Sequence, residues 1–138
     1  MTAKQYLKAM YYAQLSIRKK EEKIKELQEL ATTTGAIRYD RDRVISSTPQ
    51  SAGFENKAVR IVDMQRQLRE EIADLADMYE TGCRIINSLE DVTDKLILEM
   101  RYINHMKFSE IATEMNYSVD AIYYRHRNAL DRLKDIRI

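Results

Sequence analysis

The sequence contains very little glycine and proline and only one cysteine. Three glycines and one proline in 138 residues are too few for an all-β chain, which must turn about every 8–12 residues. The single Cys83 cannot close an intramolecular disulfide. No apolar run approaches the roughly 20 residues that span a bilayer, and the opening MTAKQYLKAMYYAQ has no apolar core for export. These absences predict an all-α, cytoplasmic protein without a membrane anchor.

The formal net charge is only +1, so the total charge does not point to nucleic acid. The charges are nevertheless unevenly distributed. Residues 1–25 contain seven lysines and arginines against two glutamates, and residues 118–138 contain five against three aspartates. Much of the balancing negative charge lies in one stretch, at Glu70, Glu71, Asp74, Asp77 and Glu80. The chain therefore has basic ends and an acidic middle.

Two long series of apolar side chains follow a heptad spacing, which is typical of paired helices. The first is Tyr6, Met10, Ala13, Ile17, Ile24, Leu27 and Ala31, interrupted by Lys20; the second is Ala58, Ile61, Gln65, Leu68, Ile72, Leu75, Tyr79, Gly82, Ile86 and Leu89. We predict helices over residues 4–31 and 56–89. An antiparallel pairing would place the basic start of the first beside the acidic part of the second, although exposed ion pairs contribute only about 0–1 kcal/mol each.

The segment between these helices, residues 32–54, holds the only proline and two of the three glycines, with serine and threonine clustered. This composition predicts a loop. We expect residues 1–89 to form a long antiparallel two-helix hairpin whose apolar stripe is too wide for two helices to bury, so that it forms a homo-oligomer or docks on a partner. A solvated spacer is the alternative. Arg38, Arg41 and Arg43 are candidates for a mobile basic contact to DNA.

Residues 90–138 carry a different pattern, which predicts a small helical domain. Leu96, Ile97, Met100 and Ile103 lie on one face of a short helix that the residues NHMK terminate. The next stretch, FSEIATEMNYSVDAIYYRHRNALDRL, fits a helix-turn-helix whose first helix begins at Phe108. In that register apolar residues take the core positions: Ile111, Ala112, Met115, Ile122, Ala129, Leu130 and Leu133. Asn116 takes the turn position with positive φ, and Ser118 caps the second helix.

Periodicity then places Val119, Asp120, Tyr123, Tyr124 and Arg127 on the outer face of the second helix, where a recognition helix meets the major groove. Arg127 is suited to guanine or phosphate, Asp120 to the amino group of cytosine, and the tyrosines to phosphates or thymine methyls. We predict that this face binds double-stranded DNA. The alternative is a three-helix domain whose tyrosines and arginine are only surface residues.

The block from Leu89 to Leu133 resembles region 4 of sigma-70 factors. The whole chain, with MTAKQYLKAM, Asp42-Arg43-Val44, Ser46-Ser47 and LEDVTDKLILEMRYINHMKFSEIATEMNYS, is similar to the sigma-like transcriptional regulators of Gram-positive phages, the ArpU/RinA type. The resemblance implies control of phage late or packaging genes together with host RNA polymerase. It also implies DNA-facing positions at Ser118, Asp120, Tyr123, Tyr124 and Arg127.

Two residues depart from this family pattern. Arg125 stands where an aliphatic residue is usual, which requires its stem to lie along the core or the helix to be slightly rotated. Lys107 stands where serine or threonine often caps the first helix, and we expect it to contact phosphate as a cation.

The sequence contains no recognisable catalytic motif. His105 and His126 are 21 positions apart, with neither metal-ligand spacing nor a nucleophile beside them, and no glycine-rich phosphate loop is present. We expect no enzyme activity, metal or cofactor. Two alternatives remain open: a phage small terminase-like DNA-recognition subunit, which usually carries its DNA-binding part first in the chain, and a helical adaptor of the transcription machinery that does not bind DNA.

Overall fold

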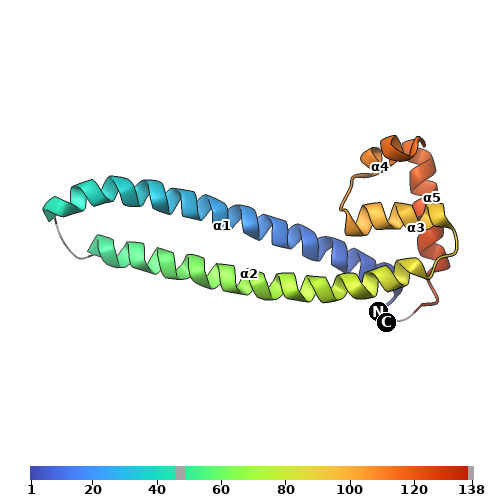
Figure 1. Ribbon diagram of the computed structural model, residues 1–138, viewed down its shortest axis with the longest axis horizontal. Coiled ribbons are helices and arrows are strands. Elements are labelled where there is room, and N and C mark those ends of the chain that lie inside the picture. Colours follow the sequence, from blue (N-terminus) through green and yellow to red (C-terminus); the bar gives the residue numbers. More distant parts are fainter. Residues whose placement is uncertain (46–48, 137–138) are drawn as a thin grey trace. The chain divides into compact units, whose positions relative to one another are not determined.

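The structure is a computed structural model that describes the backbone of residues 1–45 and 49–136, and the side chains of residues 1–32 and 56–136. All elements in this part of the chain are helical: α1 (Ala3–Ile45), α2 (Pro49–Asn87), α3 (Val92–Leu98), the π-helix η1 (Glu99–Ile103), α4 (Phe108–Met115) and α5 (Val119–Arg132) (Figure 1). The predicted all-α class is confirmed. Among the described residues, no helix is both long and apolar enough to cross a membrane.

The chain divides into two compact units. One consists of Met1–Leu15 together with Asp74–Ile138, and the other of Ser16–Ala73. The division differs from the predicted boundary between residues 89 and 90. It differs because the first turns of α1 and the last turns of α2 pack with α3, η1, α4 and α5 in one unit.

The first unit is built around side chains that are almost completely buried, and α1, α3, α4 and α5 all contribute to them: Leu7, Met10, Ile97, Leu98, Ile111, Ile122 and Leu133. Gly82 explains how α2 approaches α1 here. A Cβ atom at this position would lie 2.7 Å from Met10 Sδ, closer than van der Waals contact allows. Gly82 destabilises the interior of α2 relative to alanine, but its lack of a side chain leaves the space that Met10 occupies.

The segment from α3 to η1 buries only part of the predicted face. Ile97 and Met100 are buried as predicted, but Leu96 is 38% exposed, and Leu98 and Tyr102 are buried in addition. Asp94 is buried on the same segment, with only 3% of its surface exposed. The sequence analysis did not include Asp94 in the core, because burial of an unpaired charge is unfavourable and a sequence pattern does not reveal the partner of a carboxylate.

The N-terminus of α3 is capped by Asp91, whose carboxylate accepts a hydrogen bond from the Asp94 N–H at 3.0 Å. That hydrogen bond lowers the pKa of Asp91, since it stabilises the charged form. The following π-helix is marked by the bond from Asn104 N–H to the Glu99 carbonyl at 3.0 Å. It ends before His105, which has a φ of 58°, so the helix stops where the residues NHMK were predicted to end it.

In the second unit, segments of α1 and α2 lie side by side (Figure 1). Ile17, Ile24 and Leu68 are buried, as their heptad positions predict. Lys20, the residue that interrupts the first apolar series, forms an ion pair with Glu71. This ion pair joins the basic part of α1 to the acidic part of α2, as the uneven charge distribution predicted.

The predicted loop at residues 32–54 is too long. Helix α1 continues to Ile45 and α2 begins at Pro49, because a single helical glycine costs only about 1 kcal/mol relative to alanine and proline is well tolerated in the first turn of a helix. Residues 46–48 lie outside the described residues, as do the side chains of Arg38, Arg41 and Arg43. The predicted contact of these arginines with DNA stays a prediction.

Candidate nucleic-acid interface

Helix α4 begins at Phe108, as predicted, and its N-terminus is capped in an unexpected way. Lys107 is the N-cap residue, with an extended backbone (φ −73°, ψ 152°). Its side chain has no acceptor for the free N–H groups of the first turn. Instead, the Glu110 carboxylate accepts a hydrogen bond from the Lys107 backbone N–H at 3.2 Å. The Lys107 ammonium group is therefore not needed for capping, and the residue is exposed.

The turn between α4 and α5 has the predicted geometry. Asn116 adopts the left-handed conformation (φ 59°, ψ 38°), which asparagine tolerates better than other non-glycine residues. The N–H of Tyr117 then donates to the Ala112 carbonyl at 3.0 Å. Ser118 caps α5, since its Oγ accepts a hydrogen bond from the Ala121 N–H at 3.1 Å. Local chemistry thus ends one helix and starts the next within three residues.

The angle between α4 and α5 is held by an apolar cluster. Ile111 and Ile122 have no exposed surface, and Ala112 is 3% exposed. They pack with Ile97 and Met100, and Met106, Phe108 and Met115 lie at the edge of the cluster. The small side chain of Ala112 leaves room for the second helix at the crossing point. Of the predicted core positions, Met115 is only half-buried, and the others are buried: Ile111, Ala112, Ile122, Ala129, Leu130 and Leu133.

The predicted DNA-facing side chains of α5 lie at the surface. Tyr124 is 64% exposed, Tyr123 47% and Val119 39%; Ser118, Asp120 and Arg127 are exposed as well. Tyr123 also contacts α4, since its ring lies 4.5 Å from that of Phe108, centroid to centroid. Tyr124 is thus the aromatic residue of this face that is freest to meet a ligand.

Arg125 faces inward and has a specific partner. Its Nη1 lies 3.7 Å from Oδ1 of the buried Asp94, whose other carboxylate oxygen accepts a hydrogen bond from Arg132. The Arg125 guanidinium also lies 5.3 Å from the centre of the Tyr117 ring. This explains an arginine where the resembling family has an aliphatic residue. Sequence reasoning missed the pair because Asp94 and Arg125 are 31 positions apart.

A second cluster, of aromatic and basic residues, also escaped the sequence analysis. The Arg101 guanidinium lies between two rings, 4.4 Å from the centre of Tyr11 and 4.2 Å from that of Phe108. His105 stacks on Tyr11 with ring centroids 3.9 Å apart. These contacts attach the beginning of α1 to the segment between η1 and α4. No local spacing connects Tyr11 to residues more than 80 positions later.

His126 lies beside this cluster. Its Nε2 and the Tyr102 hydroxyl are hydrogen-bonded at 2.8 Å. Burial, together with the charges of Arg101 and Lys4, lowers the pKa of His126 from 6.5 to about 4. Burial also raises the pKa of the Tyr102 hydroxyl to about 12. Both groups are therefore neutral near pH 7, and His126 adds no positive charge to the surface.

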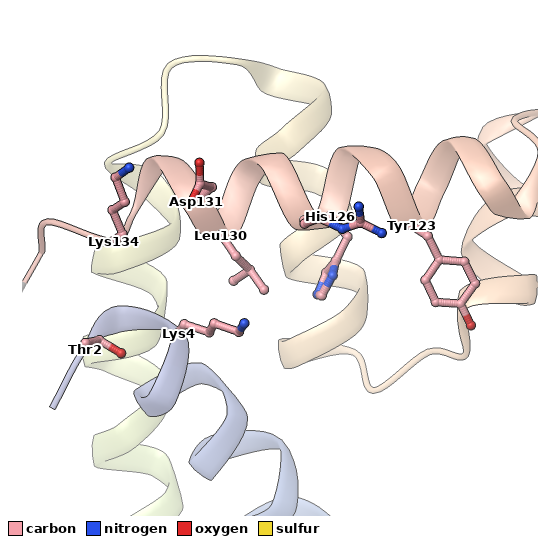
Figure 2. A pocket seen from close by; sticks show the side chains of 8 residues that line it. Thr2, Lys4, Tyr123, His126, Leu130, Asp131 and Lys134 are labelled. Carbon is pink, nitrogen blue, oxygen red and sulfur yellow. The ribbon is translucent and has the colours of Figure 1, made fainter.

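An open cavity of about 460 Å³ lies beside α5 (Figure 2). Its walls combine the first turn of α1 with one side of α5: Thr2, Lys4, Tyr123, His126, Arg127, Leu130, Asp131 and Lys134. The lining contains three basic residues, Lys4, Arg127 and Lys134, against the single carboxylate of Asp131. Two of the predicted DNA-facing residues, Tyr123 and Arg127, thus share a cavity with the beginning of α1.

The first turn of α1 is held by reciprocal hydrogen bonds. The Thr2 N–H donates to Gln5 Oε1 at 3.0 Å, and the Gln5 N–H donates to Thr2 Oγ1 at 3.2 Å. This is a capping box, and its Thr-x-x-Gln pattern is readable in the sequence TAKQ, although the sequence analysis did not use it. Ala3 is completely buried, and its N–H donates to the Ile136 carbonyl at 3.3 Å.

In the described part of the chain, no three histidine, cysteine, aspartate or glutamate side chains gather in a way that would hold a metal ion. The features that concentrate around α5 are instead exposed aromatic rings, cations and a helix N-terminus. In protein–DNA complexes, groups of these kinds make most of the contacts to phosphate and sugar.

Comparison with known proteins gives one match. A family described as "Protein of unknown function (DUF1492)" matches residues 59–134, which include most of α2 and all of α3, η1, α4 and α5. No curated protein and no solved structure matches the chain.

Proposed function

The chain belongs to the DUF1492 family, whose description assigns no function, and we propose from its own residues that it is a sequence-specific regulator of transcription that binds double-stranded DNA. In this proposal α4 and α5 form a helix-turn-helix, and α5 enters the major groove. The proposal depends chiefly on one observation: a capped helix that packs on a buried apolar cluster carries two tyrosines and an arginine that are exposed at the surface.

The roles of the individual residues follow from their chemistry. Arg127 is suited to a bidentate contact with guanine, and Asp120 accepts from the amino group of cytosine. Tyr124 packs on a thymine methyl or donates to a phosphate, while Ser118 and Val119 lie where the helix N-terminus approaches the backbone. Lys107, whose exposed ammonium group takes no part in the cap of α4, contacts a phosphate at the start of α4.

In this proposal α1 and α2 form an antiparallel hairpin that serves assembly. Several of their apolar side chains remain on the surface: Leu30 is 62% exposed, Val59 58%, Val62 61% and Ile72 42%. A partner that covered these side chains would bury apolar surface, which favours association. A homo-oligomer would also suit DNA recognition, since two copies can read two half-sites.

The place of action is proposed from the resemblance to the sigma-like ArpU/RinA regulators. It suggests a cytoplasmic protein that acts at phage late or packaging promoters with host RNA polymerase. In this proposal α5 is the DNA-reading element, and the protein acts as a regulator of transcription.

The test is a selection of duplexes from a randomised library, followed by binding measurements on the enriched sequence. Tyr124→Ala and Arg127→Ala should each weaken binding to that sequence by about 1–3 kcal/mol where the side chain reaches a base edge. A variant that loses only a phosphate contact should weaken binding to all sequences alike. Arg84→Ala is the control. Arg84 is exposed, lies on the last turn of α2 and pairs only weakly with Glu80 at 3.8 Å, so its loss should leave binding unchanged.

Three outcomes would decide against the proposal. If no sequence is enriched, the protein does not recognise a specific sequence, and the hypothesis of a helical adaptor of the transcription machinery is favoured. If a sequence is enriched but both α5 variants bind it as the parent does, α5 is not the reading element. If the protein forms large closed rings in solution, the small terminase-like role replaces that of a regulator.

A further inference from the structure

The beginning of α1 is part of the surface that surrounds α5, although it lies more than 110 positions away in the sequence. Thr2 and Lys4 line the same cavity as Tyr123, His126 and Arg127. In Figure 2 the Lys4 side chain extends beside Leu130 toward His126. The influence of the Lys4 charge on the pKa of His126 agrees with this proximity. Lys4 is therefore held next to the proposed recognition helix.

The position of Lys4 is well defined because its helical turn is anchored on both sides. The Thr2–Gln5 capping box fixes the backbone of the turn. Ala3, immediately before Lys4, is buried and bonded to the Ile136 carbonyl. Lys4 itself is exposed. The turn thus holds the start of the Lys4 side chain in place, and its ammonium group is free to make a charge-assisted hydrogen bond to an anion.

The charge around the cavity also suits an anion. Lys4, Arg127 and Lys134 face a single carboxylate, that of Asp131, and His126 is neutral near pH 7 because its pKa is about 4. The excess of positive charge is not balanced within the cavity. A lysine presents its charge on a flexible stem and does not read a base pattern as a planar guanidinium does, so a phosphate is the matching ligand.

The beginning of α1 does not cover the base-reading end of α5. Val119, Asp120 and Tyr124 do not line the cavity, and Tyr124 is 64% exposed. Tyr123 and Arg127 do line it but are exposed as well. An autoinhibitory segment would have to bury these side chains. The cavity instead lies beside the later turns of α5, from Tyr123 to Lys134, where a helix seated in the major groove reaches the phosphates at the rim of the groove.

We propose that Lys4 contacts a DNA backbone phosphate at this cavity, next to Arg127, so that the first turn of α1 is a second, sequence-independent part of the DNA interface. The proposal rests on the proposed DNA-binding function and adds a residue that lies outside the helix-turn-helix. It makes α1 a part of the DNA-binding surface as well as a part of the proposed hairpin.

The test compares Lys4→Gln with Lys8→Gln in the full-length chain. Both changes remove one exposed lysine charge from α1, but only Lys4 lines the cavity. Binding is measured by fluorescence anisotropy on the selected duplex and on a scrambled duplex, over a series of salt concentrations. Lys4→Gln should weaken binding to both duplexes equally, by about 3–10-fold, and reduce the slope of log K against log salt by about 0.9, as expected for one lost phosphate contact. Lys8→Gln should bind as the parent does.

The proposal is overturned if Lys4→Gln and Lys8→Gln behave alike, if Lys4→Gln binds more tightly than the parent, or if it weakens binding to the selected duplex alone. Thermal melting by circular dichroism verifies that both variants fold. Failure of the underlying function looks different. If the parent does not prefer the selected duplex, sequence-specific recognition is refuted, but the comparison of the two lysine variants on the scrambled duplex still tests the phosphate contact. If the parent binds neither duplex, both proposals fail.

Discussion

At the scale of single residues, His126 shows how burial and packing change the properties of a side chain. In the sequence it is one of two histidines on a stretch with a basic character. In the structure its ring is hydrogen-bonded to Tyr102 and lies edge-on to Phe108, with ring centroids 4.9 Å apart. His126 therefore belongs to the packing between η1, α4 and α5.

The lowered pKa of His126 predicts a loss of stability in mild acid. The unfolded chain takes up this proton near pH 6.5, but the folded protein takes it up only near pH 4. Between these values the unfolded state binds more protons, so the free energy of unfolding falls as the pH falls. After allowance for solvent screening, we expect a loss of about 1–2 kcal/mol between pH 7 and pH 4.5, measured by urea denaturation.

The matched variants are His126→Gln and Tyr102→Phe. His126→Gln removes the titrating group and should flatten the decline over this interval. Tyr102→Phe keeps the ring packing and the histidine, so the decline should remain although the overall stability is lower. An unchanged decline in His126→Gln would assign the acid sensitivity to other groups.

At the scale of elements, Asp94 connects α3 to α5. The carboxylate is 4% exposed and is held by Arg125 and Arg132, which lie two turns apart on α5. Both arginines keep access to water, with side chains 39% and 60% exposed. Either arginine alone can still neutralise the buried charge, whereas the loss of both leaves it unpaired, which is the costly situation for a buried ion.

We therefore expect the two arginines to act non-additively. Arg125→Ala and Arg132→Ala should each destabilise the protein by about 0.5–1.5 kcal/mol, and the double variant by about 3–5 kcal/mol, because an uncompensated buried charge carries the larger penalty. Urea denaturation of the four proteins at pH 7 measures this coupling. A double variant whose loss equals the sum of the single losses would show that Asp94 is not the shared partner.

The turn between α4 and α5 is the element that the sequence predicted most completely. Asn116 and Ser118 act on backbone groups no more than four residues away, in hydrogen bonds that any chain with the same local sequence makes. The exposure of Val119, Asp120, Tyr123, Tyr124 and Arg127 follows from the same register. Their role in binding DNA stays a prediction, since it depends on a partner.

At the scale of the whole molecule, the division into units predicts that residues 90–138 do not form an independent domain. A fragment of these residues loses Leu7 and Met10 from the core, the stacking of Tyr11 on His105 and the packing of Arg101 between Tyr11 and Phe108. The loss of several large buried side chains lowers the free energy of unfolding by more than the total stability of a small domain. The fragment should melt without a cooperative transition in circular dichroism.

A second fragment provides the control. Residues 1–15 added as a separate peptide should restore part of the signal if the contacts of Leu7, Met10 and Tyr11 are responsible. The conclusion would be reversed by a 90–138 fragment that melts cooperatively at the temperature of the full chain. The boundary predicted between residues 89 and 90 would then describe the folding units better than the packing does.

The sequence alone determined the helical class, the start of α4, the turn at Asn116, the cap at Ser118 and the buried face of α5. All of these follow from periodicity or from hydrogen bonds between near neighbours. It also indicated that the basic first helix would lie beside the acidic stretch of the second, and the ion pair of Lys20 with Glu71 agrees with this prediction.

Only the tertiary structure decided which distant residues meet. Asp94 with Arg125, Tyr11 with His105 and Lys4 with the cavity beside α5 are separated by 31 to more than 100 positions, and no periodic pattern relates them. It also decided the face of α3, because a carboxylate is buried only where cations from another helix reach it. Local patterns specify helices and their ends, whereas contacts between helices depend on how all the buried side chains pack together.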